Sequence, residues 1–140
     1  MVICFHGYTS NGMGEYPSLA RCFMSRGFGA LIIDQRSHGQ SEGKYIGFGC
    51  MDRLDALEWI RWTVDKVGQD AQIILHGGSM GGATVCMVSG LDLPPGEGII
   101  SDSAFTSPST CSPTCCTACT LACHPMILWP TNGQPNVWQA

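Results

Sequence analysis

The chain alternates short apolar runs with stretches whose apolar residues recur at helical spacing. Four short, mostly apolar runs are typical of strands buried on both faces of a parallel sheet, and they occupy residues 2–5, 30–33, 73–75 and 98–101. Helices are predicted between them at residues 17–27, 51–66 and 81–88, since apolar side chains there return every three or four positions. Strands and helices that alternate with short links form right-handed β-α-β units. We therefore expect an α/β fold with a parallel, doubly wound sheet.

Polar and glycine-rich segments directly follow the predicted strands. In a parallel α/β sheet the carboxyl ends of the strands meet at one edge, where chemistry gathers. The residues expected at this edge are His6, Asp34, residues 76–79 and Asp102.

Gly77-x-Ser79-x-Gly81 stands between the third predicted strand and the next helix. This is the nucleophile-elbow pattern, in which a serine occupies a sharp strand-to-helix turn. The residues two positions before and after it must be almost free of side chain, because strand and helix backbones approach closely there. The positive N-terminal end of the helix favours negative charge that develops at the serine.

Composition narrows the class of protein. The chain has 140 residues, 44% hydrophobic content and a net charge of −4, which fits one globular domain or part of one and argues against a nucleic-acid partner. No apolar stretch approaches the roughly 20 residues that span a bilayer, and no signal peptide is visible. We therefore expect a cytoplasmic protein with no membrane partner in this chain.

Charge divides the chain into two parts. All 7 basic and all 11 acidic residues lie at or before Asp102, and five of the nine cysteines lie between Cys111 and Cys123. A soluble surface normally carries charge throughout. We place a boundary near Pro108, with a first domain at residues 1–108 and an anomalous Cys/Thr/Pro-rich tail at residues 109–140.

Three interpretations of the tail stay open. Its cysteines could form a zinc or redox site, although paired C-x2-C knuckles are missing. A second interpretation is a genuine amphipathic helix, because the spacing places the cysteines on one helix face. The third is translation out of frame: cysteine codons begin T-G, and N-T-G encodes only Leu, Met or Val. The odd total of cysteines favours a reducing compartment in each case.

Three ordered motifs carry a family resemblance: Phe5-His6-Gly7-Tyr8-Thr9-Ser10-Asn11, then Asp34-x-Arg36-x-His38-Gly39-x-Ser41, then Gly77-x-Ser79-x-Gly81. Together they resemble the α/β-hydrolase superfamily, especially its bacterial serine-aminopeptidase-like and cinnamoyl-esterase-like members. The likeness covers residues 2 to about 108, and residues 101–107 also fit. It implies that the first strand is the third of the family's eight, so that the chain is a fragment holding the central part of the fold.

The resemblance implies a serine hydrolase that cleaves an ester, thioester or amide through an acyl-enzyme on Ser79. The backbone N–H groups of Tyr8 and Met80 would form the oxyanion hole. No metal or organic cofactor is implied, and the partner would be a small-molecule or short-peptide acyl substrate.

The rest of the catalytic triad is missing from the expected positions. Chain order in this fold is serine, acid, histidine. His124, in the tail, is the only histidine after Ser79. Asp102 is a candidate acid, with a structural hydrogen-bonding role as the alternative, and we expect structural roles for His6, His38 and His76. We therefore expect this chain alone to be inactive. The alternatives are a non-catalytic α/β-hydrolase remnant and a protein that binds metal through the tail cysteines.

Overall fold

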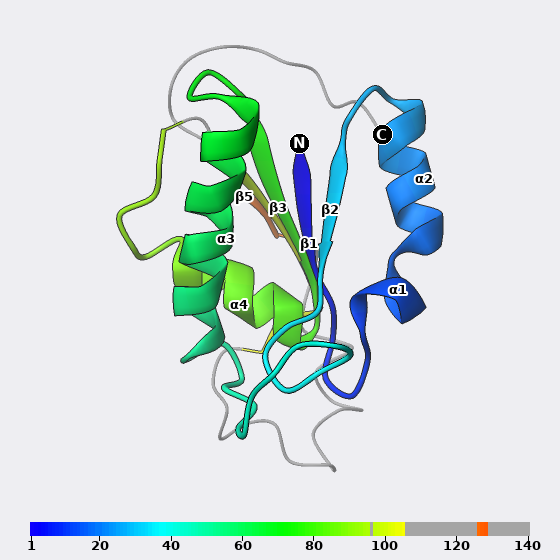
Figure 1. Ribbon diagram of the computed structural model, residues 1–140, viewed down its shortest axis with the longest axis vertical. Helices are drawn as coiled ribbons and strands as arrows, with labels where there is room; N and C mark the ends of the chain where they lie inside the picture. The colour runs from blue at the N-terminus through cyan, green and yellow to red at the C-terminus, as the bar shows by residue number, and fades with distance from the viewer. Residues whose placement is uncertain (96, 106–125, 129–140) are drawn as a thin grey trace.

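The computed structural model describes residues 1–95, 97–105 and 126–128 and contains a five-stranded sheet in the order β2-β1-β3-β4-β5 (Figure 1). The strands are β1 (Val2–Phe5), β2 (Ala30–Ile33), β3 (Ile73–Gly78), β4 (Glu97–Asp102) and β5 (Met126–Leu128). Strands β1 to β4 pair in parallel, whereas β5 pairs antiparallel with β4. The four predicted strands and their parallel arrangement are confirmed. The antiparallel fifth strand is a difference from the prediction.

Helices lie on both faces of the sheet, as the α/β prediction requires. Helices α1 (Gly12–Glu15) and α2 (Pro17–Ser25) lie on one face, and α3 (Asp52–Val67) and α4 (Met80–Val88) lie on the other (Figure 1). Pro17 is the first residue of α2, where its fixed backbone angle suits a helix start. The three predicted helices are present within two residues of their expected bounds, and the single-turn α1 is additional.

Strand β1 is buried on both faces, which explains its uninterrupted apolar sequence. Ile3 and Phe5 belong to the core beneath α3 and α4, whereas Val2 and Cys4 belong to a second core with Tyr16. All four strand residues are almost inaccessible to solvent. Successive strand side chains point to opposite faces, so a strand between two helical layers must be apolar at every position.

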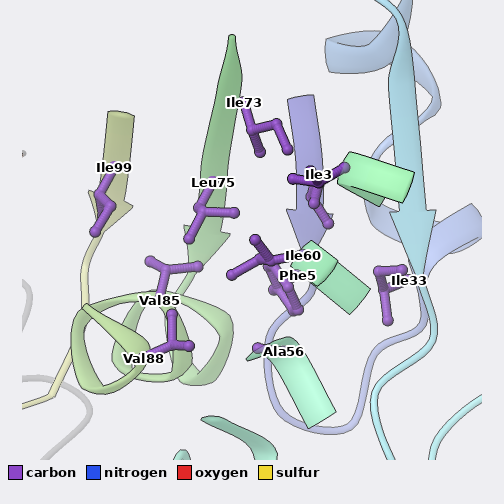
Figure 2. Packing of buried hydrophobic residues seen from close by; sticks show 11 residues of the cluster. Ile3, Phe5, Ile33, Ala56, Ile60, Ile73, Leu75, Val85, Val88 and Ile99 are labelled. Carbon is purple, nitrogen blue, oxygen red and sulfur yellow. The ribbon is translucent and has the colours of Figure 1, made fainter. Parts of the chain in front are cut away.

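The larger core lies between the sheet and the helices α3 and α4 (Figure 2). It joins side chains from all four parallel strands to two helices, and Figure 2 labels Ile3, Phe5, Ile33, Ala56, Ile60, Ile73, Leu75, Val85, Val88 and Ile99. This packing fixes α4 against the centre of the sheet, where β3 and α4 meet at the predicted elbow.

The predicted boundary near Pro108 and the tail cysteines lie outside the described residues. The two-domain division and the three interpretations of the tail therefore stay predictions. In the part of the chain that the structure describes, no helix has the length and apolar character needed to cross a membrane.

Candidate active site

Ser79 occupies the turn between β3 and α4 in a strained backbone conformation. Its φ is 52° and its ψ is −110°, a combination that side-chain-bearing residues rarely adopt and that is typically found at functional sites. The turn is held from both directions: Ser79 N–H donates to the carbonyl oxygen of Asp102 at 2.8 Å, and Ser79 O accepts from Ala83 N–H at 3.0 Å. Ser79 is exposed. The predicted elbow geometry is therefore present, with its serine accessible at the sheet edge.

The glycines around Ser79 are required by close backbone contacts. A Cβ on Gly77 would overlap the backbone of Gly81, and a Cβ on Gly81 would overlap the carbonyl group of Phe5. The first contact brings β3 and α4 together across the turn, and the second packs the start of α4 against the end of β1. These are the steric demands that the sequence pattern predicts.

The loop after β1 passes beside Ser79. A Cβ built on Gly7 would lie 3.5 Å from Ser79 Cβ. The imidazole of His6 is fully buried, and its Nε2 accepts from Gln35 N–H at 3.0 Å. Its Nδ1 therefore carries the proton and donates to the carbonyl oxygen of Gly7 at 2.7 Å. Ser10 N–H donates to the same oxygen at 3.3 Å.

These two hydrogen bonds fix the peptide group between Gly7 and Tyr8. In a trans peptide the N–H points opposite to the carbonyl, so Tyr8 N–H is turned away from His6. Among the described residues, neither Tyr8 N–H nor Met80 N–H has a hydrogen-bond acceptor. Both predicted oxyanion donors are thus backbone N–H groups without an acceptor in the described part of the chain, one in the loop beside Ser79 and one directly after it.

Residues 1–128 match the family model described as serine aminopeptidase, S33. The chain belongs to this family. The predicted resemblance to the α/β-hydrolase superfamily is therefore confirmed, and the match extends past the predicted boundary near Pro108.

Two relatives show how much of a family member this chain represents. The protein YqkD of Bacillus subtilis (strain 168) is 32% identical over 90 residues, which are 64% of this chain and 29% of that protein. The esterase Pf2001 of Pyrococcus furiosus has a TM-score of 0.61 at 29% identity, and the match covers 74% of this chain and 41% of the esterase. The chain therefore spans less than half the length of either relative.

The described histidines of this serine aminopeptidase S33 family member have partners other than Ser79. Both ring nitrogens of His6 are engaged in the loop, and the Nδ1 of His38 lies 2.9 Å from the carbonyl oxygen of Arg36. The Nδ1 of His76 lies 2.9 Å from the hydroxyl of Tyr16. No hydrogen bond joins any of these three rings to Ser79, and His124 lies outside the described residues.

His76 and Tyr16 form a buried polar pair beneath the edge. The Tyr16 hydroxyl also lies 3.0 Å from the carbonyl oxygen of Phe5. Burial lowers the pKa of His76 and raises the pKa of Tyr16, because each charged form would lose its hydration. Both groups are therefore held neutral, as expected for a structural pair.

Asp102 meets the elbow through its backbone. Its carbonyl oxygen accepts from Ser79 N–H, while its carboxylate accepts from Ser103 Oγ at 2.9 Å. The first contact is the structural role weighed for this residue, and the role of catalytic acid stays a prediction.

Asp34 organises the loop that follows β2. Its Oδ1 accepts from Gly12 N–H at 2.7 Å and its Oδ2 from Gln40 N–H at 3.0 Å. These backbone hydrogen bonds lower the pKa of the carboxyl group. Asp34 therefore connects the loop of the second motif to the start of α1, which is a structural role.

Three residues near the elbow were missed by the sequence analysis. Glu15 Oε2 accepts from Gly7 N–H at 2.9 Å, and the Gln35 side chain connects the loop to α4. Phe48 lies with its ring centroid 5.2 Å from that of Tyr8, packs against the cluster that contains Met80, and has a positive φ of 48°. Only the glycines flanking Phe48 gave a local signal, since they commonly accompany unusual backbone angles.

Other kinds of site are not apparent at the elbow. In the described ranges, no group of three or more His, Cys, Asp or Glu side chains is placed to hold a metal ion. A groove lies between the end of β2 and α3, lined by Asp52, Trp59 and Trp62 among others, and Ser79 is not part of its wall.

Proposed function

We propose that this chain carries the nucleophile and the oxyanion hole of a serine hydrolase that cleaves an ester, thioester or amide through an acyl-enzyme on Ser79. The backbone conformation of Ser79 carries the proposal. An accessible serine held at a strained strand-to-helix turn is the arrangement that presents a hydroxyl to a substrate carbonyl.

In the proposed reaction, Ser79 Oγ attacks the carbonyl carbon and its proton passes to a base. The resulting oxyanion accepts hydrogen bonds from Tyr8 N–H and Met80 N–H, each worth about 3 kcal/mol of transition-state stabilisation. The intermediate collapses as the leaving group takes the proton, and water then attacks the acyl-enzyme by the same steps in reverse order. The fixed Gly7–Tyr8 peptide supports this assignment because its N–H needs no rearrangement.

The base in this proposal is a histidine other than His6, His38 and His76, since no hydrogen bond joins any of these three described rings to Ser79. The likeness to the Pyrococcus furiosus esterase supports an ester as the first substrate class to test. Small-molecule and short-peptide acyl compounds remain the proposed partners. We also propose a cytoplasmic location, which the free thiols of Cys4, Cys22, Cys50 and Cys86 support.

A non-catalytic remnant is the second candidate. It is favoured by one observation: within the described residues no histidine is hydrogen-bonded to Ser79. In this alternative the elbow is retained because its glycines let β3, α4 and β1 pack together.

Added imidazole separates the two candidates by standing in for the base that the described residues do not place at Ser79. We expect the 140-residue chain to hydrolyse a 4-nitrophenyl ester only when imidazole is present, and to lose this rate in Ser79→Ala but not in Ser89→Ala, which changes an exposed serine at the other end of α4. A fluorophosphonate probe should label Ser79 under the same conditions. Equal rates in the wild type and Ser79→Ala would support the remnant, and an adduct on another residue would refute the assignment.

A further inference from the structure

Gln35 joins the two backbone segments that carry the proposed oxyanion donors. Its side-chain Nε2 donates to the carbonyl oxygen of His6 at 2.5 Å, and its Oε1 accepts from Thr84 Oγ1 at 2.9 Å. The three side chains are nearly inaccessible to solvent, with Gln35 4% exposed and both His6 and Thr84 at 0%. The buried amide of Gln35 thus donates a hydrogen bond to the loop after β1 and accepts one from α4.

Each end of this bridge lies close to a donor. The His6 carbonyl begins the peptide that leads into Gly7, and the next peptide carries Tyr8 N–H. Thr84 stands one turn into α4, and its single hydroxyl proton is shared between Gln35 Oε1 and the carbonyl oxygen of Met80, which lies 3.1 Å from Thr84 Oγ1. Gln35 also uses its backbone, since its N–H donates to His6 Nε2 and so sets the tautomer that fixes the Gly7 carbonyl.

We infer that Gln35 is a positioning residue that holds Tyr8 N–H and Met80 N–H where both can donate to the same oxyanion. The inference rests on the function proposed above. Two donors stabilise one oxygen only if both lie within hydrogen-bond distance of it, so their mutual placement matters as much as their presence. The hydrogen bonds of Gln35 go to His6 and Thr84 and not to Ser79, so Gln35 acts through the two backbone segments.

Removing the amide leaves two buried polar groups without this partner. In Gln35→Met the side chain keeps its length, but the His6 carbonyl and the Thr84 hydroxyl lose their bonds to Gln35. An unpaired buried carbonyl is unfavourable, so the His6–Gly7 peptide should turn toward another donor. Tyr8 N–H then moves relative to Met80 N–H. Because the oxyanion is absent from the bound substrate and forms only in the tetrahedral intermediate and the transition states that flank it, kcat should fall while KM changes little.

The experiment compares Gln35→Met and Thr84→Val with Thr63→Val in the imidazole-supplemented ester assay. Thr63 is a matched control, because its buried hydroxyl also donates to a carbonyl four residues earlier, at 2.7 Å, but on α3. We expect Gln35→Met to lower kcat by about tenfold to a hundredfold with KM within about twofold. Thr63→Val should change kcat by less than about twofold. The double variant Gln35→Met/Thr84→Val should lose less than the product of the two single losses, since the bond that the two residues share is removed in each single variant.

The outcomes distinguish failure of the inference from failure of the proposed function. A Ser79-dependent rate that is unchanged in Gln35→Met overturns the role of Gln35 and leaves the proposed function standing. If the wild type has no Ser79-dependent rate, the proposed function fails. Backbone amide NMR then tests whether Gln35 positions the Tyr8 and Met80 N–H groups. Shifts of both the Tyr8 and Met80 amides in Gln35→Met, with neither shifted in Thr63→Val, would support it, and unshifted amides would overturn it.

Discussion

Replacing Ser79 by glycine should stabilise the protein, although it removes the proposed nucleophile. A residue with a Cβ in this region of backbone space costs about 1–3 kcal/mol, and Ser79 has a φ of 52° and a ψ of −110°. Glycine relieves that cost, but it destabilises the folded state by about 0.5–1 kcal/mol because it gives the unfolded chain more conformational freedom. Within the described residues the Ser79 hydroxyl makes no hydrogen bond, so its loss adds nothing. The net expectation is a gain of about 0.5–2 kcal/mol for Ser79→Gly over Ser79→Ala, which keeps the Cβ and the strain.

Urea unfolding followed by circular dichroism measures this difference. Ser89 is the matched control, because it ends the same helix with a right-handed φ of −62°. At Ser89 the glycine variant should be less stable than the alanine variant by about 0.5–1 kcal/mol. The two positions should therefore give opposite signs. If Ser79→Gly is instead less stable than Ser79→Ala, the backbone conformation of Ser79 costs no stability and this reasoning is wrong.

Three further predictions concern the polar pair and the glycine beneath the elbow. Tyr16→Phe should cost about 1–3 kcal/mol in urea unfolding because it removes the buried hydroxyl that bonds the Phe5 carbonyl oxygen and His76 Nδ1, whereas Tyr8→Phe, at a residue that is 51% exposed, should cost less than about 0.5 kcal/mol. Burial lowers the pKa of His76 in the folded protein. Below about pH 6.5 the unfolded state therefore binds more protons at this residue than the folded state does. The free energy of unfolding should fall with acidification, by at most about 1.4 kcal/mol per pH unit from this group. The stability of His76→Gln should depend less on pH between 7.5 and 5.5, and an equal dependence would contradict this account. Gly81→Ala should cost about 3 kcal/mol or more and reduce the folded fraction, because its Cβ would overlap the Phe5 carbonyl; a variant as stable as the wild type would refute that contact.

The sheet could be predicted because its strands are apolar for a local reason. Residues 2–5 face helices on both sides, so each of their positions is buried and the sequence shows the strand directly. Strand β3 was predicted to end at Leu75 but continues to Gly78, since Gly77 and Gly78 pair with β4. Glycine has low strand propensity, and this extension depends on a partner strand more than on local sequence. The single-turn α1 was missed because its four residues include two glycines and its capping comes from Asn11, whose Oδ1 accepts from Gly14 N–H.

The elbow could be predicted for a similar reason, whereas the residues that support it could not. The glycine spacing around Ser79 is local, because the strand-to-helix turn brings Gly77 and Gly81 together. Gln35 and Thr84 are 49 positions apart in the sequence. They meet only because the fold brings the segment after β2 next to α4. No periodicity or spacing in the sequence predicts such a contact.

The tail leads to a last prediction, which concerns the gene. Of residues 103–140, which carry no charged side chain, the structure describes residues 103–105 and β5, and β5 runs against the direction of the four parallel strands. If the tail is translated out of frame, shifting the frame near codon 108 should give a helix-forming stretch with charged residues, followed by a Gly-x-x-Asp segment and a late histidine. That histidine would be the base that the described residues do not provide at Ser79. Protein made from the shifted frame should then hydrolyse the 4-nitrophenyl ester without imidazole, and Ser79→Ala should abolish the rate. Stop codons within a few residues of the shift would rule this out, and the tail cysteines would then belong to a genuine helix or a metal site.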